Sequence, residues 1–330
     1  MKTSQASSGA LTQKLWEKVL FDDTMKEVYF QKFMGQGSTN VVQEKNDLES
    51  KKGDAITIGL IPRSDAPVLG DGEALEGNED NLDKYYFTIT VEEKVFALRD
   101  RGPLDRQRAV YDMDMESRDA MKVRGAEYLD QRCFDALQDT PTKTIYGGSA
   151  TLYTNIAATD LITTDLISRV KAGAKTGFNR TQTPLRPVRV GGKDYFIMLV
   201  HPDALYDLKQ DSAFQQARRE AEVRSKENPI FSDAYAIWDG VVIHEHENIA
   251  IAKDGGAGAN IPTSKNLFLG QQALVMAWAS RPKIVAAEFD YGREHGFSWQ
   301  AMFNVKKPKF NSLDYGAISV HTARTSVSDA

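Results

Sequence analysis

The sequence predicts an α+β fold in which two compact bodies carry long extensions. Its 330 residues exceed the usual size of one domain, which favours two bodies. A helical pattern over residues 115–137 is long enough to cross a small domain, and it lies between segments rich in β-branched and aromatic residues. Two of those segments, 55–61 and 85–91, flank a glycine-rich acidic stretch and predict a long hairpin.

The composition indicates a chain that buries a core and does not bind nucleic acid through phosphates. Hydrophobic residues make up 41% and charged residues 26%, and 41 Lys and Arg against 46 Asp and Glu give a formal net charge of -5. Proteins that bind phosphates usually carry a basic excess or stripe, so a dedicated nucleic-acid reader is disfavoured. Cys133 is the only cysteine, which excludes an intrachain disulfide and a thiolate zinc site.

Neither a targeting segment nor a membrane span is expected. Residues 1–10 are small and polar and lack the apolar core of a signal peptide. No apolar run approaches the roughly 20 residues that cross a bilayer. We therefore expect a soluble protein that is made in a reducing cytosol.

The first segment predicts an amphipathic helix. Leu11, Leu15 and Val19 recur every four residues with Trp16 beside them, and the pattern continues to Phe33 before it stops at a glycine pair. This helix lies outside the segments that form the later core. Two interpretations stay open: it packs on its own chain, or its apolar stripe contacts a surface elsewhere.

The predicted hairpin continues from its second strand into residues 95–98, and its tip spans residues 68–80. A two-stranded hairpin alone is marginally stable in water. We therefore expect it to lie against a neighbouring subunit.

The rest of the chain predicts a helical region followed by a mixed α/β body. A short helix is expected over 104–111, and then the long helix 115–137, which spans roughly 35 Å and carries Cys133 in its apolar stripe. Further helices and strands are listed in chain order: helix 163–174, strand 195–200, helix 204–208, and strands 240–244, 249–252, 284–291, 299–305 and 317–321.

His244-Glu245-His246-Glu247 is the strongest candidate for chemistry. On a strand, the two histidines face the same side and are close enough to share a metal. No placeable third ligand follows, and the spacing differs from that of His-Glu-x-x-His on a helix. A polar strand edge or turn is favoured, and a metal-dependent hydrolase using His244 and His246 is kept as the alternative function.

The remaining polar clusters lack the spacing of known sites. The acidic stretch 71–80 has carboxylates for calcium but not the EF-hand order, and the glycine-rich stretch 254–258 lacks the residues of a phosphate loop. Cys133 falls in an apolar stripe, where a cysteine is usually inert packing. We therefore expect no enzyme, no catalytic residue, no cofactor and no metal.

The order of elements, together with several short stretches, resembles a known family. The chain is similar to the major capsid proteins of N-four-type podoviruses, which have the Hong Kong 97-type phage capsid fold. The stretches that carry the resemblance are 11–17, 33–35, 69–77, 125–130, 268–274 and 314–318, in the order in which they occur. The resemblance extends from about Leu11 to Ala323.

The resemblance implies a domain plan. Residues 1–53 would form an N-terminal arm and 54–100 an extended hairpin loop that overlaps an adjacent subunit. Residues 101–187 and 283–330 would form a peripheral domain with the spine helix 115–137, and 188–282 an axial domain.

The resemblance also implies a function. The chain would be a major capsid protein that self-assembles as hexamers and pentamers into an icosahedral shell, enclosing double-stranded DNA without sequence-specific binding. A separate scaffolding protein, a portal and a decoration protein are the expected partners, with assembly in the host bacterial cytoplasm and a final place in the virion. Another ring-forming phage protein, a tail tube or portal-like subunit, stays open as an alternative.

The residues expected to contact neighbouring subunits belong to the N-terminal stripe and to the hairpin tip. They are Leu11, Leu15, Trp16, Val19, Val68, Leu69, Asp71, Glu73, Leu75 and Glu76.

Overall fold

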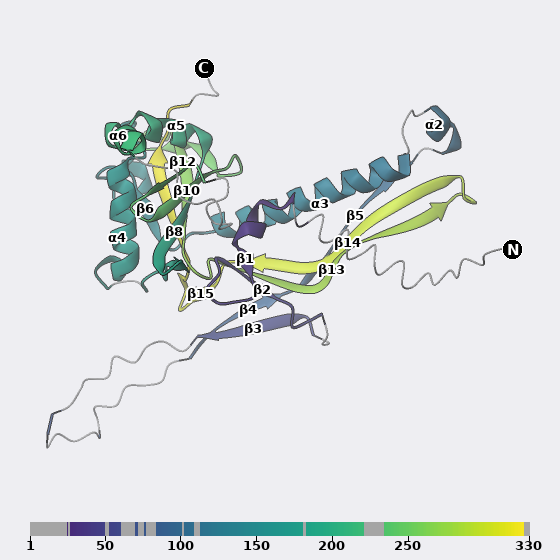
Figure 1. Cartoon of the computed structure of the whole chain (residues 1–330), viewed down its shortest axis with the longest axis horizontal. Coiled ribbons are helices and arrows are strands. Elements are labelled where there is room, and N and C mark those ends of the chain that lie inside the picture. The colour runs from purple at the N-terminus through teal and green to yellow at the C-terminus, as the bar shows by residue number, and fades with distance from the viewer. Residues whose placement is uncertain are drawn as a thin grey trace.

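The computed structural model places two bodies end to end, one elongated and one compact (Figure 1). The structure describes residues 25, 27–49, 53–60, 70, 71, 76, 84–100, 102–108, 113–180, 183–220 and 234–326. Among these residues, no helix is both long enough and apolar enough to cross a membrane.

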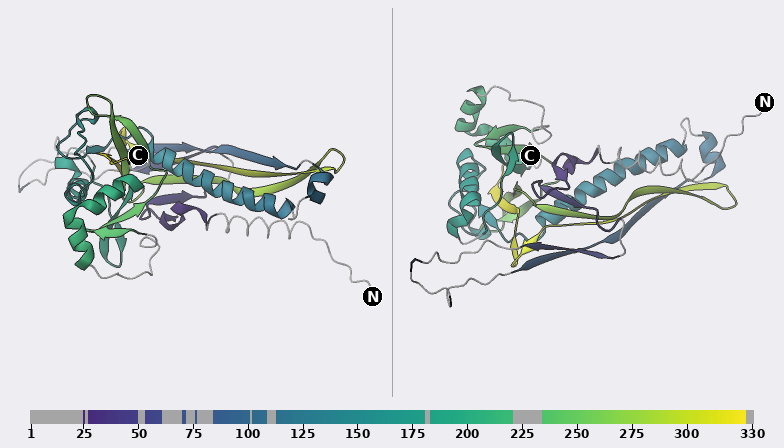
Figure 2. Two further views of the ribbon diagram at one scale, coloured as in Figure 1. Left: turned by 90° about the horizontal axis from the view of Figure 1, so that it is seen from above. Right: turned by 60° about the horizontal axis from the view of Figure 1, so that its bottom comes forward.

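The elongated body consists of a five-stranded sheet and a long helix. The sheet order is β1-β2-β13-β14-β5, and α3 runs along the β13–β14 ribbon away from the compact body (Figures 1 and 2). The bounds are β1 (Met34–Gly35), β2 (Val42–Lys45), β5 (Glu92–Arg99), β13 (Leu274–Phe289), β14 (Glu294–Lys306), α2 (Pro103–Arg108) and α3 (Met113–Gln138).

The apolar stripe of α3 explains how the helix lies on the sheet. Leu129, Cys133 and Leu137 recur every four residues, and all three are buried. At Gly125 a Cβ atom would lie 2.8 Å from Nε1 of Trp299 in β14, so glycine is what lets the helix approach the sheet this closely. The predicted helix 115–137 is confirmed.

The compact body is an eight-stranded sheet with helices packed on it. The strand path is β6-β17-β12-β8-β10-β9, with β11 on β12 and β7 on β8. The bounds are β6 (Thr144–Tyr146), β7 (Val188–Val190), β8 (Lys193–Val200), β9 (Ala236–Trp238), β10 (Val241–Glu245), β11 (Ile251–Gly255), β12 (Ile261–Leu269), β17 (Ala317–Ala323), η2 (Tyr153–Asn155), α4 (Thr164–Arg180), α5 (Pro202–Gln210) and α6 (Ser212–Glu220). The buried run at the end of β8 pairs in parallel with β10, as expected for a strand covered on both faces.

A separate hairpin joins the elongated body near its base. β3 (Ala55–Leu60) pairs antiparallel with β4 (Tyr85–Thr90), as predicted. Ile56 and Ile89 bury against Ala277 of β13, and this small cluster holds the hairpin on the sheet. A second short pair, β15 (Lys309–Phe310) and β16 (Leu313–Asp314), lies beside it, with the Phe87 and Phe310 rings 6.4 Å apart.

Buried charges hold the link between α3 and the returning C-terminal strands. Asp314 accepts the backbone N–H of Thr142 at 2.8 Å and forms a buried ion pair with Lys307 at 3.1 Å. Lys143, only 1% exposed, donates to the carbonyl of Thr183 at 2.9 Å. The charge of Asp314 also acts on the Lys143 ammonium group and opposes the effect of burial on its pKa.

The structure corrects the expected hairpin in one respect. Residues 95–98, expected to prolong its second strand, lie instead in β5, which pairs with β14 of the elongated sheet. The strand pairing also divides the chain at other residues than the expected domain boundaries do. β17 and α4, expected in the peripheral domain, lie in the compact body, and β13 begins at Leu274, inside the expected axial range.

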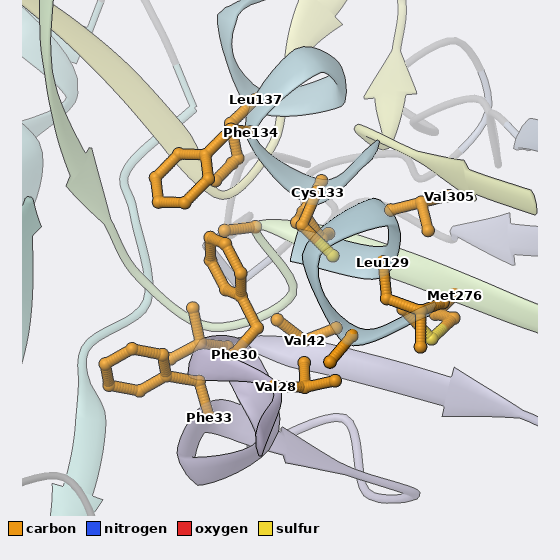
Figure 3. Close-up of a cluster of buried hydrophobic side chains, with 14 of the residues drawn as sticks. Val28, Phe30, Phe33, Val42, Leu129, Cys133, Phe134, Leu137, Met276 and Val305 are labelled. Carbon is orange, nitrogen blue, oxygen red and sulfur yellow. The ribbon is translucent and has the colours of Figure 1, made fainter. Parts of the chain in front are cut away.

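The end of the predicted N-terminal helix packs on its own chain. Tyr29–Phe33 form a short 3-10 helix, η1, and Val28, Phe30 and Phe33 bury against α3 residues such as Phe134 (Figure 3). Of the two interpretations that the sequence leaves open, packing on its own chain holds for these residues. Leu11, Leu15, Trp16 and Val19 lie outside the described residues.

Candidate functional site

The two candidate metal ligands are packed into aromatic surroundings. His244 ends up fully buried in β10, with its ring 5.3 Å from Phe33, so the expectation of a polar strand edge is wrong for it. His246 follows β10, and its ring centroid is 4.4 Å from both Tyr29 and Phe134. Burial lowers the pKa of His246 to about 4, so the ring is neutral at pH 7.

No three His, Cys, Asp or Glu side chains come together to hold a metal ion in the part of the chain that the structure describes. Cys133 lies in the packed stripe of α3, and burial raises the pKa of its thiol well above the usual value. A thiol in this state is a packing group rather than a nucleophile. Within the described residues, His244, His246 and Cys133 thus serve as packing groups.

The predicted contact residues are described only in part. Asp71 and Glu76 of the hairpin tip are exposed. Val68, Leu69, Glu73 and Leu75 fall outside the described residues, as do those of the N-terminal stripe.

The elongated body exposes apolar side chains on the sheet face opposite α3, which we call the outer sheet face. Phe96 and Trp299 stack at 4.9 Å on the α3 side, and side chains alternate along each strand, so Val95 and Met302 point the other way. Val95 is 53% exposed, and Met302 and Phe289 are each 43% exposed. Arg99 lies over the Phe289 ring at 4.5 Å and pairs with Glu294.

A groove lies on the α3 side of β5, between this strand and α3. It has a volume of about 600 Å³, and its lining is mainly apolar. The lining residues are Lys94, Val95, Phe96, Ala97, Leu98, Ala120, Met121, Arg124 and Tyr128. β5 ends the strand path of its sheet, so within the described residues its outer edge has no partner strand.

An unpaired strand edge beside exposed apolar side chains favours association with another chain. Edge strands present free N–H and C=O groups, and contiguous apolar surface marks interaction sites. A pattern in the sequence indicates this surface. Val95-Phe96-Ala97-Leu98 puts apolar side chains on both faces of one strand, and α3 covers only one of these faces.

Comparisons with known proteins match nearly the whole chain. A family model described as "Phage capsid protein" matches residues 3–145 and 139–326. The major capsid protein of Pseudomonas phage KPP25 is 26% identical over an alignment 364 residues long. The alignment covers 94% of this chain and 94% of that protein.

Solved structures match as well. The capsid of Ralstonia phage GP4 has a TM-score of 0.80 with 28% identity, covering 91% of this chain and 92% of the other. The Cyanophage Pam1 capsid has a TM-score of 0.77 with 22% identity, covering 92% and 93%.

Proposed function

Because the chain belongs to the phage capsid protein family, we propose that it is the major capsid protein that builds the head shell of a phage. Its α+β fold is the Hong Kong 97-type capsid fold, as predicted. The observation that carries the proposal is the match of fold and sequence over nine-tenths of the chain to a phage capsid. Copies associate as hexamers and pentamers into an icosahedral shell around double-stranded DNA.

The outer sheet face and the groove are the surfaces we assign to this association. A shell subunit contacts several neighbours, and its apolar surfaces become buried only in the assembly. Val95 and Met302 on the face, and Leu98 in the groove, supply such surface on the two sides of the sheet. A neighbouring copy would bury both sides of β5.

The contact residues proposed from sequence are retained. The spacing of Leu11, Leu15, Trp16 and Val19 supports a stripe that contacts a neighbour. The hairpin tip, with Val68, Leu69, Asp71, Glu73, Leu75 and Glu76, is proposed to reach the β5–α3 groove of an adjacent subunit. Support comes from the exposure of Asp71 and Glu76 and from the apolar lining of the groove.

A capsid protein resides in the virion. We propose that assembly takes place in the host bacterial cytoplasm, with a separate scaffolding protein, a portal and a decoration protein as partners. The shell encloses DNA without sequence-specific binding, in keeping with a net charge of -5. The subunit acts through contacts and not through catalysis. The elongated body is assigned to the periphery of each capsomer and the compact body to its axis.

Electron microscopy of the overexpressed protein, alone and with its genomic neighbours, tests the proposal. Closed polyhedral shells or hexameric capsomers are expected. Stacked tubes or single rings of constant number would instead support a tail-tube or portal-like subunit. Soluble monomers with metal-dependent hydrolysis would contradict the proposal.

A further inference from the structure

A carboxylate from far along the chain holds residues 28–33, which we call the arm root, on α3. Asp130 accepts the backbone N–H of Tyr29 at 2.8 Å and of Phe30 at 3.2 Å. These residues open η1, and Val28 before them makes no side-chain cap hydrogen bond. The first amides of a helix have no partner inside it, so Asp130 supplies the cap that the local sequence lacks.

The Asp130 carboxylate is buried without a counter-ion in contact. It is 8% exposed, and in the described part of the chain it takes part in no ion pair. Its charged and titratable surroundings are Lys32 on η1, His246 and Glu247 on the loop after β10, and Arg124, Glu127, Arg132 and Cys133 on α3. His246 and Cys133 are neutral at pH 7, because burial lowers the pKa of the first and raises that of the second.

We propose that Asp130 is a proton-coupled latch, which binds the arm root to α3 more firmly as the solvent becomes mildly acidic. The proposal concerns a single folded subunit and holds whether or not copies assemble into a shell.

The direction of the pH effect follows from the pKa of Asp130, which is higher when the arm root is docked than when it is released. Burial raises the pKa of Asp130 to about 6, and the two backbone hydrogen bonds and Lys32 oppose this only in part. Once the root lifts off, water reaches the carboxylate and its pKa returns to about 4. The docked state therefore binds the proton more tightly, and docking strengthens as the pH falls from 7 towards 5.

Hydrogen exchange of the full-length, unassembled chain measures how firmly the arm root is bound to α3. Peptides that contain residues 28–33 are followed by mass spectrometry at pH 5, 6 and 7, with rates corrected for intrinsic exchange. The two pKa values of about 6 and about 4 predict about tenfold greater protection at pH 5 than at pH 7. A peptide from β8, which does not contact Asp130, reports any general change in stability. Protection of the arm root that stays flat, or rises with pH, would overturn the proposal.

Two variants test whether the pH dependence comes from Asp130 or from another carboxylate. Asp130→Asn keeps the shape and an accepting oxygen but cannot titrate, so its protection should be equal at pH 5 and pH 7. Asp135→Asn makes the same change at an exposed position of the same helix and should keep the tenfold rise. A tenfold rise that survives in Asp130→Asn contradicts the latch. If that variant does not fold, the wild-type profile alone decides.

Discussion

Asp130 and Tyr29 are 101 residues apart in the chain, yet the Asp130 carboxylate accepts the backbone N–H of Tyr29 at 2.8 Å. This hydrogen bond joins the start of η1 to the middle of α3. Beside it, Phe30 and Phe33 enter the same core as Phe134 and Leu137 (Figure 3). The arm root is therefore part of the subunit's own core.

Phe30→Ala tests that statement. Phe30 is fully buried, so its truncation should lower the free energy of unfolding of the unassembled subunit by about 3–5 kcal/mol. Gln31→Ala, at the exposed neighbouring position, should change it by less than about 0.5 kcal/mol. Urea unfolding followed by circular dichroism gives both values. Equal, small effects would mean that the arm root docks only in the assembly.

Asp314→Asn tests the buried charges that link α3 to the C-terminal strands. The substitution leaves the buried Lys307 without its ion-pair partner and removes the charge that acts on Lys143, so a loss of about 3–5 kcal/mol in the free energy of unfolding is expected. Asp290→Asn removes the carboxylate of an exposed ion pair with Arg293 and should cost less than about 1 kcal/mol. Position 290 has φ 50°, which asparagine tolerates well. Similar losses in the two variants would contradict the account.

Lys143 predicts a rise in stability at alkaline pH. Burial lowers its pKa to about 8, while an unfolded lysine keeps its proton to about pH 10. Between these values the unfolded chain binds more protons, so this group's contribution to stability rises with pH, by up to about 3 kcal/mol. Lys143→Met should lack that rise, and Lys175→Met, at an exposed position, should keep it. Unfolding free energies at pH 7, 8.5 and 10 check this.

Val95→Lys tests the outer sheet face. Val95 is 53% exposed, so the subunit should keep its free energy of unfolding within about 0.5 kcal/mol. A charge buried at an interface without a partner is costly, so shell yield in sedimentation should fall at least tenfold. Val95→Ile keeps the apolar character and should assemble normally. Normal shells from Val95→Lys would show that this face stays in solvent.

Deletion of residues 67–82 tests the hairpin tip. The pairing of β3 with β4 and the burial of Ile56 and Ile89 lie outside the deletion, so a soluble, folded subunit is expected. Stable shells should not form, because the proposed contact with an adjacent groove is lost. Circular dichroism and electron microscopy give the two readouts. Particles of normal number and stability would refute the role of the tip.

The sequence predicted those elements whose patterns are local. The four-residue spacing of Leu129, Cys133 and Leu137 indicated α3, and the apolar run of residues 195–200 indicated β8. Residues 267–279 form one apolar run in the sequence but belong to two strands. β12 ends at Leu269, and β13 begins at Leu274 in a different sheet. The periodicity of apolar residues indicates which side chains are buried, but it does not indicate which sheet a strand joins.

The association surface was predicted less well, for the same reason. The sequence predicts residues 95–98 as part of the hairpin, since nothing in their spacing indicates that β14 is their partner. The Asp130 cap joins residues a hundred positions apart, and the sequence around Val28 shows only that a cap is missing. For His244 and His246 the sequence favours a polar strand edge or turn, whereas the fold surrounds them with Phe33, Tyr29 and Phe134.

We propose that copies of this chain form a shell by burying the outer sheet face and the β5–α3 groove. A cryo-electron microscopy map of the assembled particle at side-chain resolution tests it most directly. An icosahedral shell is expected, in which a neighbouring subunit covers Val95, Met302 and the groove at Leu98. A shell in which these side chains all face solvent, or a particle built from another chain, would contradict it.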